Sequence, residues 1–170
     1  GIVALRWRVV PTDQSVLGAT ALESLPGIEQ LFIERASGMS SAEFDRALYL
    51  ARVRAEVGYR EEGIDCYIVS MSARTVVYKG LMVATDLARF FPDLEDERTV
   101  SGMAPFHQRF ATNTHATWRL AQPFRLIAHN GEINTLVGNR NWMSAREPEL
   151  TSNFWGDQLE DLIPVIHPIG

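Results

Sequence analysis

Residues 40–58, SSAEFDRALYLARVRAEVG, carry the clearest structural signature in the sequence. The apolar residues of this stretch recur every three or four positions, which is the spacing of one face of an α-helix. Ser40 and Glu43 fit a capping box, in which each side chain binds a backbone N–H of the first turn. Gly58 is the predicted end, because glycine commonly follows the last turn of a helix. The stretch therefore predicts a helix of about four to five turns.

Strand-like segments lie on both sides of this helix. We predict strands at residues 2–10, 28–35, 66–71, 75–79, 103–111 and 124–129, with the third and fourth paired as a hairpin. Residues 11–27 are expected to be a loop, and Asn134 or Thr135 is expected to cap a helix that runs through Met143. Hairpins and helices without regular βαβ units favour the α+β class over a doubly wound sheet.

The composition is typical of a globular domain. The chain has 170 residues, of which 46% are hydrophobic and 22% are charged. This hydrophobic fraction excludes a disordered chain, and no apolar run is long enough to span a membrane. Sixteen Lys+Arg against 21 Asp+Glu give a net charge of −5, which argues against sequence-independent nucleic-acid binding. One cysteine excludes an internal disulfide and favours a reducing compartment.

Polar residues that could bind a substrate or take part in catalysis concentrate in two stretches. In the first, residues 107–114 (HQRFATNT), Arg109 offers the planar fork of donors that binds a carboxylate, with hydroxyl and amide groups close by. The alternative is a strand end whose arginine pairs with a surface acid. In the second, residues 129–134 (HNGEIN), Asn130 and Gly131 offer N–H donors suited to an oxyanion hole. An ordinary Asn-Gly turn is the alternative, and this stretch taken alone favours the turn.

The remaining reactive residues show no site pattern. His107, His115, His129 and His167 lack the spacing of metal ligands, so no metal site is expected. Neither Gly-rich nucleotide fingerprint is present. Cys66 lies in an apolar predicted strand, and we expect its thiol to be buried and inert.

The two polar stretches occur together with several other motifs in a recognisable order. These are WRVVP (7–11), SARTVVYKG (72–80), FPDL (91–94), WRLAQPFR (118–125), AHNGEINT (128–135) and GNRNWM (138–143). In this combination the chain resembles the glutaminase domain of the glutamate synthase large subunits, a class II glutamine amidotransferase. The resemblance covers nearly the whole chain and is most specific between residues 105 and 143.

The resemblance implies a four-layer αββα sandwich of the N-terminal-nucleophile hydrolase type. It also implies hydrolysis of L-glutamine to glutamate and ammonia, which travels to a second site where 2-oxoglutarate is aminated and reduced. By match to the family motifs, Arg109 would bind the α-carboxylate of glutamine and Thr112 would line the same pocket. Asn130 and Gly131 would form the oxyanion hole.

Two departures from the family pattern concern catalysis. The family nucleophile is an N-terminal cysteine, whereas residue 1 is glycine and Cys66 matches an ordinary strand position. A substrate-binding aspartate of the family would follow just after Gly170. We therefore interpret residues 1–170 as a single internal segment that lacks the nucleophile region and the C-terminal remainder, and we expect this segment alone to be inactive.

The resemblance also bears on cofactors, partners and location. FMN and an iron–sulfur cluster would belong to C-terminal domains of the parent protein, with none in this segment, and a small reductase subunit is a further expected partner. The electron donor stays open between pyridine nucleotide and ferredoxin. We expect a cytoplasmic protein, or a plastid one if the source is a plant or alga. The alternative function is a glutamine-binding or scaffold module that lacks the nucleophile.

Overall fold

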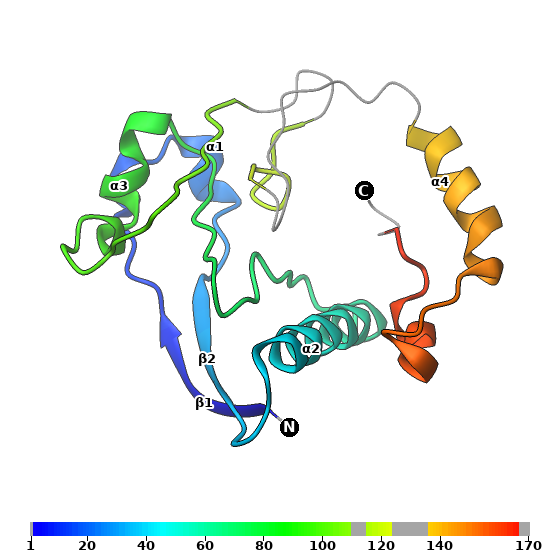
Figure 1. Ribbon diagram of the computed structural model, residues 1–170. Coiled ribbons are helices and arrows are strands. Elements are labelled where there is room, and N and C mark those ends of the chain that lie inside the picture. The colour runs from blue at the N-terminus through cyan, green and yellow to red at the C-terminus, as the bar shows by residue number, and fades with distance from the viewer. Residues whose placement is uncertain (1, 110–114, 124–135, 167–170) are drawn as a thin grey trace.

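The computed structural model describes residues 2–109, 115–123 and 136–166 (Figure 1). The strands are β1 (Ile2–Val9) and β2 (Glu29–Arg35), and the helices are α1 (Ala19–Glu23), α2 (Ser41–Glu61), α3 (Leu87–Phe90) and α4 (Leu136–Arg146). Turns of 3₁₀-helix lie at Gln14–Val16, Ala84–Asp86, Pro92–Leu94, Glu147–Glu149 and Gly156–Leu162. This mixture of helix and sheet agrees with the class that the sequence predicts.

The sheet of the described residues consists of β1 and β2, which pair antiparallel. Trp7 lies opposite Leu31 and Val9 lies opposite Glu29, and the register shifts between Ala4 and Arg6. Both strands confirm the prediction for residues 2–10 and 28–35. The loop predicted between them is wrong in part, since it contains α1 and a 3₁₀ turn that the Asp13 carboxylate caps by accepting the Ser15 N–H at 3.0 Å.

α2 begins with the predicted capping box. The Glu43 N–H donates to Ser40 Oγ at 3.2 Å, and the Ser40 N–H donates to Glu43 Oε2 at 2.8 Å. The predicted end at Gly58 is wrong, because the helix continues to Glu61. The glycine that follows its end is Gly63, whose φ of +68° allows the Gly63 and Ile64 N–H groups to bond the carbonyls of Arg60 and Tyr59.

The predicted hairpin after α2 is wrong, because residues 66–71 and 75–79 form no strands. Serine hydroxyls take N–H groups that a ladder would use: Ser70 Oγ accepts from the Val77 N–H at 3.3 Å, and Ser72 Oγ accepts from the Arg74 N–H at 3.1 Å. The strand predicted at residues 103–111 is also absent over 103–109. The strand predicted at 124–129 lies outside the described residues.

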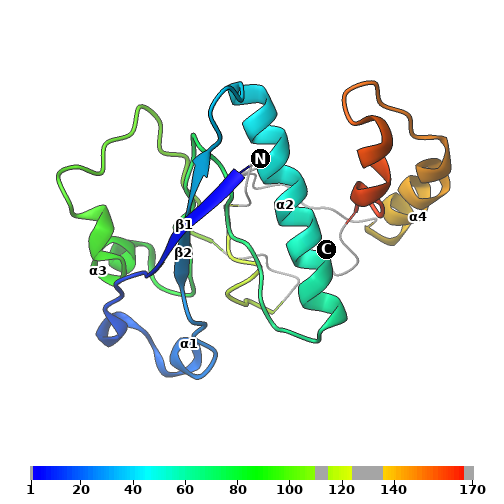
Figure 2. The same cartoon turned by 90° about the horizontal axis from the view of Figure 1, so that it is seen from below.

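The main apolar core lies at one end of the molecule, where α1 and α3 lie (Figure 2). Its buried members are Val10, Leu17, Ala21, Phe90, Phe91 and Trp118. The Phe90 ring is fully buried and packs edge-on against Phe91, with centroids 4.6 Å apart, and against Trp118 at 5.7 Å. The Trp118 indole N–H donates to the Ala21 carbonyl at 3.2 Å, so the core joins segments that are 97 residues apart.

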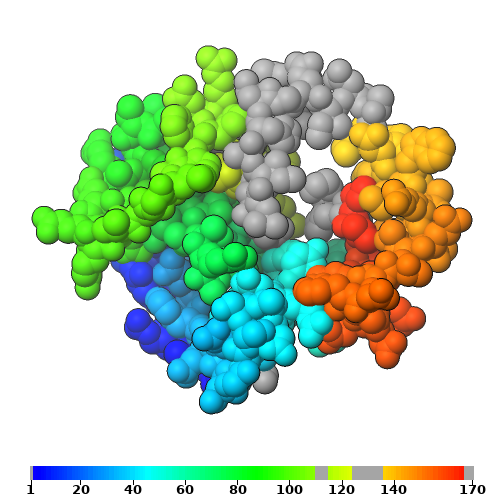
Figure 3. Space-filling view, in the orientation of Figure 1, coloured from blue at the N-terminus to red at the C-terminus, as the bar shows by residue number. Residues whose placement is uncertain are grey.

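The C-terminal part of the chain contacts α2 through the 3₁₀ turn at Gly156–Leu162. In Figure 3 the orange residues lie against the cyan start of this helix. The Tyr49 and Trp155 rings are 5.5 Å apart, and Arg46 Nη1 donates to the Phe154 carbonyl at 2.9 Å. α4 confirms the helix predicted through Met143, although its predicted caps Asn134 and Thr135 lie outside the described residues. None of the described α4 residues is buried.

Candidate functional site

The first predicted polar stretch is described as far as Arg109. Residues 107–109 form no strand, and both Gln108 and Arg109 are exposed. The Arg109 N–H donates to Nδ1 of His107 at 3.1 Å, and this bond fixes the backbone at Arg109. No carboxylate of the described residues pairs with the Arg109 guanidinium. The alternative interpretation of Arg109, a surface ion pair, thus gains no support from this part of the chain.

The other three predicted site residues, Thr112, Asn130 and Gly131, lie outside the described residues. Whether they meet Arg109 in one pocket therefore stays a prediction.

The chain is firmly anchored between the two polar stretches. The Trp118 side chain is only 4% exposed in the core, and its ring fills the space beside Gly80. A Cβ atom added at Gly80 would lie 2.5 Å from the Trp118 Cζ3 atom, so a residue without a side chain is needed there. The contact between residues 118 and 80 thus fixes the position of the chain at Trp118.

A cationic cluster adjoins this anchor, and we call it the Tyr67 cluster: Asp65, Cys66, Tyr67, Lys79 and Arg119. The Arg119 guanidinium lies 5.1 Å from the Tyr67 ring centroid and donates to Asp65 Oδ1 at 3.1 Å. The Lys79 ammonium lies 5.5 Å from the same ring and donates to the Arg119 carbonyl at 2.6 Å. Burial raises the pKa of Tyr67, and the Arg119 charge opposes that rise. Both cations lie against this ring and so tie residue 119 to the loop after α2.

Cys66 corrects a prediction, since its side chain is exposed and not buried. The predicted strand around it does not form, so Cys66 is not buried within a sheet. It follows the end of α2, where its N–H donates to the Ile64 carbonyl at 2.9 Å. Its thiol also contacts the Tyr59 hydroxyl, whose pKa is raised mainly by burial and secondarily by Cys66. A small cavity of about 40 Å³ lies beside this pair, bounded by Arg119 as well.

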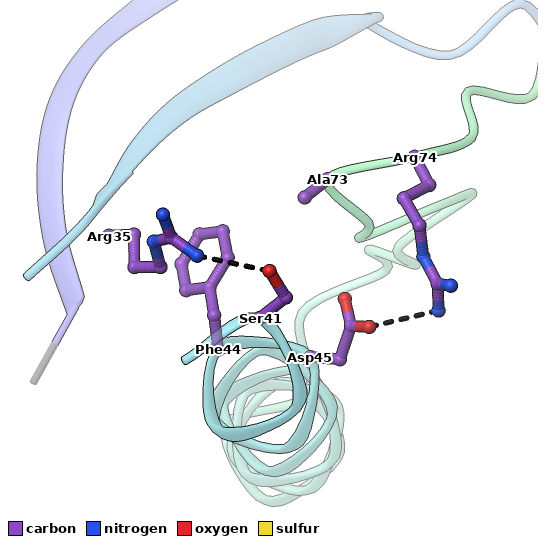
Figure 4. Close-up of a pocket in the computed structure, with 6 residues that line it drawn as sticks. All are labelled: Arg35, Ser41, Phe44, Asp45, Ala73 and Arg74. Carbon is purple, nitrogen blue, oxygen red and sulfur yellow. Dashed lines mark hydrogen bonds and ion pairs between the residues drawn. The ribbon is translucent and has the colours of Figure 1, made fainter. Parts of the chain in front are cut away.

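A larger cavity, about 330 Å³, lies between the end of β2 and the start of α2 (Figure 4). Its lining consists of Arg35, Ser41, Phe44, Asp45, Ala73 and Arg74. Arg35 Nη1 donates to Ser41 Oγ at 3.1 Å, and Arg74 Nη2 donates to Asp45 Oδ2 at 2.9 Å. The two guanidinium groups are thus occupied by neighbours. Arg109, the one predicted glutamine-site residue that the structure describes, is not part of this lining.

The described parts of the chain contain neither a metal-ligand cluster nor a membrane-spanning helix. No group of three or more His, Cys, Asp or Glu side chains converges there. None of the helices in those parts combines the length and the apolar character that a membrane crossing requires.

Comparison with known proteins places the chain in a family. The family model of the class II glutamine amidotransferases matches residues 1–170. The chain belongs to this family. The matched range includes both polar stretches.

Curated relatives of this amidotransferase chain are large proteins. It is 47% identical over 161 residues to the glutamate synthase (NADPH) large chain of Azospirillum brasilense, which covers 94% of the chain and 11% of the relative. It is 43% identical to the corresponding Bacillus subtilis protein, over 100% of the chain and 11% of the relative. It is 39% identical to the chloroplastic ferredoxin-dependent glutamate synthase of Spinacia oleracea, over 99% of the chain and 10% of the relative. The chain thus spans about a tenth of the length of these relatives.

The sequence did not reveal the structural role of Trp118 and Arg119, which fix the chain between the two polar stretches. Trp118 and Arg119 belong to a segment that the resemblance singled out, but no role followed from the segment alone. The available signal was the glycine after Lys79, in a stretch otherwise rich in large side chains. Such a glycine indicates that another part of the protein approaches closely, although it does not identify that part.

Proposed function

We propose that the chain is part of the glutaminase domain of a glutamate synthase, and that this domain hydrolyses L-glutamine to glutamate and ammonia. The observation that carries the proposal is the family match over all 170 residues, together with 39–47% identity to three glutamate synthases. Relatives of both the NADPH and the ferredoxin type match at similar identity, so the electron donor stays open.

In this proposal Arg109 holds the α-carboxylate of glutamine through two parallel N–H bonds, and Thr112 lines the same pocket. The exposure of Arg109 and the absence of a competing carboxylate among the described residues support the assignment. Asn130 and Gly131 donate to the oxygen that becomes negative when the side-chain amide of glutamine is attacked. These roles rest on the family motif.

The attacking group is a thiol that the described residues do not supply. In the family pattern an N-terminal cysteine forms a thioester with the glutamine side chain, and the amide nitrogen takes up the proton of the thiol and leaves as ammonia. Water then hydrolyses the thioester, which releases glutamate and restores the thiol. Cys66, the only cysteine of the sequence, lies beside Tyr59 and Arg119 and matches no catalytic position. We therefore propose that residues 1–170 by themselves do not turn over glutamine.

The wider arrangement is proposed on the same basis. The sheet β1–β2 and the helices around it would contribute to a four-layer αββα sandwich, and ammonia would pass to a distant site where 2-oxoglutarate is aminated and reduced. An iron–sulfur cluster would lie outside residues 1–170, because one cysteine cannot provide the several thiolates that such a cluster needs. FMN would likewise lie outside them, as the family pattern implies. A small reductase subunit is a further proposed partner, and the cytoplasm or a plastid the proposed compartment.

The test uses the full-length protein that contains this chain. Purified protein is incubated with L-glutamine, and ammonia and glutamate are measured together with glutamine binding by calorimetry. Equal release of ammonia and glutamate supports the glutaminase, and residues 1–170 alone should give background rates. Saturable binding without hydrolysis would instead favour the alternative, a glutamine-binding module, and neither binding nor hydrolysis would overturn both.

A further inference from the structure

The cavity between the end of β2 and the start of α2 contains charged groups that the proposed hydrolysis of glutamine does not use (Figure 4). Its volume of about 330 Å³ lies in the range of sites that bind small molecules. Two guanidinium groups and one carboxylate line it, those of Arg35, Arg74 and Asp45. Phe44, which is only 8% exposed, supplies an apolar wall.

Arg35 is a cation that no carboxylate of the described residues neutralises. Its Nη1 donates to Ser41 Oγ at 3.1 Å. This contact uses one of the five N–H donors of the guanidinium, so a ligand carboxylate beside Ser41 can bind to the others. Arg35 is also exposed, and a ligand from solvent can therefore reach it.

Asp45 provides an acceptor one helical turn away from Ser41. The two residues are four positions apart on α2, so their side chains lie on the same face of the helix, with Cβ atoms about 5–6 Å apart. Oδ2 of Asp45 accepts from Arg74 Nη2 at 2.9 Å, whereas Oδ1 has no hydrogen-bond partner among the described residues. In Figure 4 this second oxygen points away from Arg74. Asp45 can thus accept a further donor while it keeps its ion pair.

The charges of the cavity match those of one class of small molecule. Two cations and one anion are the complement of a ligand with two carboxylates and one ammonium group, which is the charge set of an acidic α-amino acid. The ammonium nitrogen and the α-carboxylate carbon of such a ligand are about 2.5 Å apart. The α-carboxylate can therefore bind Arg35 while the ammonium group donates to Asp45. The second carboxylate then lies near Arg74, and the methylene groups contact Phe44.

We propose that this cavity binds an acidic α-amino acid through Arg35, Asp45 and Arg74. None of its lining residues is among those to which the proposed function assigns a role, which are Arg109, Thr112, Asn130 and Gly131. The class of ligand follows from the charges of the cavity alone. The choice of L-glutamate as the probe rests on the proposed function, in which L-glutamate is a product.

Calorimetric titration of the full-length protein with L-glutamate tests the site. Arg35→Gln removes the partner of the α-carboxylate and should weaken binding to this cavity by about 10-fold or more, as for the loss of a charged hydrogen bond. The matched control is Arg98→Gln, because the Arg98 side chain is 91% exposed and does not line the cavity. Binding elsewhere in the protein is common to all three proteins, so the difference between their titrations isolates this cavity. Three titrations that superimpose would overturn the proposal.

A second ligand distinguishes recognition of an amino acid from attraction of any anion. Glutarate has the two carboxylates of glutamate but no ammonium group, and it should bind this cavity about 10-fold more weakly or worse. Asp45→Asn should weaken the binding of L-glutamate by a similar factor without weakening that of glutarate. Equal affinities of the two ligands would overturn the proposal, since the cavity would then bind anions without reading the ammonium group. Ammonia release from L-glutamine by the unmodified protein reports separately on the proposed function.

Discussion

At the scale of single residues, Arg109 offers the most direct test of the glutamine pocket. Replacing it with lysine keeps the charge but removes the two parallel N–H donors that match a carboxylate. We expect Arg109→Lys in the full-length protein to raise KM for glutamine by roughly 10- to 100-fold, as for the loss of a charged hydrogen bond, with a smaller effect on kcat. Steady-state glutaminase kinetics measure both constants.

The control for that variant is Arg98→Lys, because Arg98 is an exposed arginine whose carboxylate partner, Asp96, lies two residues away. It should leave KM unchanged. An equal rise of KM in both variants would mean that the effect comes from a general loss of positive charge and not from a glutamine contact at Arg109.

Asn130 should behave differently from Arg109 in the same assay. An oxyanion donor acts mainly in the transition state, so Asn130→Ala is expected to lower kcat by roughly 100-fold or more while KM changes little. Asn130→Asp keeps the size of the side chain but replaces the donor with a carboxylate, and it should be at least as slow. A change in KM alone would contradict the oxyanion role.

The sequence predicts residue chemistry better than residue environment. The donor fork of Arg109 follows from its side chain alone, and the structure leaves it exposed. The prediction that Cys66 is buried is wrong, because it depended on a strand that does not form. Whether a short apolar run becomes a strand depends on a pairing partner elsewhere in the chain, and here the Ser70 and Ser72 hydroxyls bind the backbone instead.

At the scale of elements, the start of α2 carries a measurable share of helix stability. Ser40→Ala removes the oxygen that accepts the Glu43 N–H and should lower the free energy of unfolding by about 1 kcal/mol. Glu43→Gln should retain most of that stability, because glutamine also completes a capping box. Urea unfolding followed by circular dichroism distinguishes the two variants.

The same cap predicts a pH dependence. Hydrogen bonds from the Ser40 side chain, then from its backbone, hold the pKa of Glu43 below the ordinary value of 4.5. The stabilisation is therefore complete above that ordinary value and is lost as the pH falls through the lowered pKa. The stability difference between the unmodified protein and Glu43→Gln should shrink when unfolding is measured at about pH 3 instead of pH 6. A difference that does not vary with pH would contradict this role of Glu43.

Local signals explain which elements were predicted correctly. The capping box and apolar periodicity of α2 lie within a few residues of one another, and both appear in the structure. The predicted end of α2 is too early because a glycine can lie inside a helix, as Gly58 does, or just beyond its end, as Gly63 does. Only the positive φ of Gly63 distinguishes the two glycines. α1 was missed because its single turn has no recurring apolar face.

At the scale of the whole molecule, the close approach of Gly80 and Trp118 determines how the core closes. Gly80→Ala sets a methyl group against a buried indole ring and should lower the free energy of unfolding by about 1–3 kcal/mol. Gly102→Ala is the matched control, since no atom of the described residues lies within 4 Å of its added Cβ, and it should change stability by less than about 0.5 kcal/mol. Similar values for the two variants would contradict the tight contact.

The membership of this core could be predicted only in part. Phe90 and Phe91 are adjacent aromatic residues, and their burial follows from their size. Nothing in the neighbourhood of Trp118 indicates that it packs against Phe90 or bonds the carbonyl of Ala21. Such contacts between distant segments depend on the path of the entire chain, which hydrophobic periodicity does not encode.

The hydrogen bond between Trp118 and Ala21 also determines how late the core can close during synthesis on the ribosome. Ninety-seven residues separate its two ends, and translation at about 5–20 residues per second takes about 5–20 s to cross that interval. During this time α2 can already form from its own local contacts. Val10, Leu17 and Ala21, in contrast, cannot complete their packing until the Trp118 indole has been synthesised. The nascent chain thus displays an unfinished apolar surface for seconds, long enough for a chaperone to bind it before the core closes.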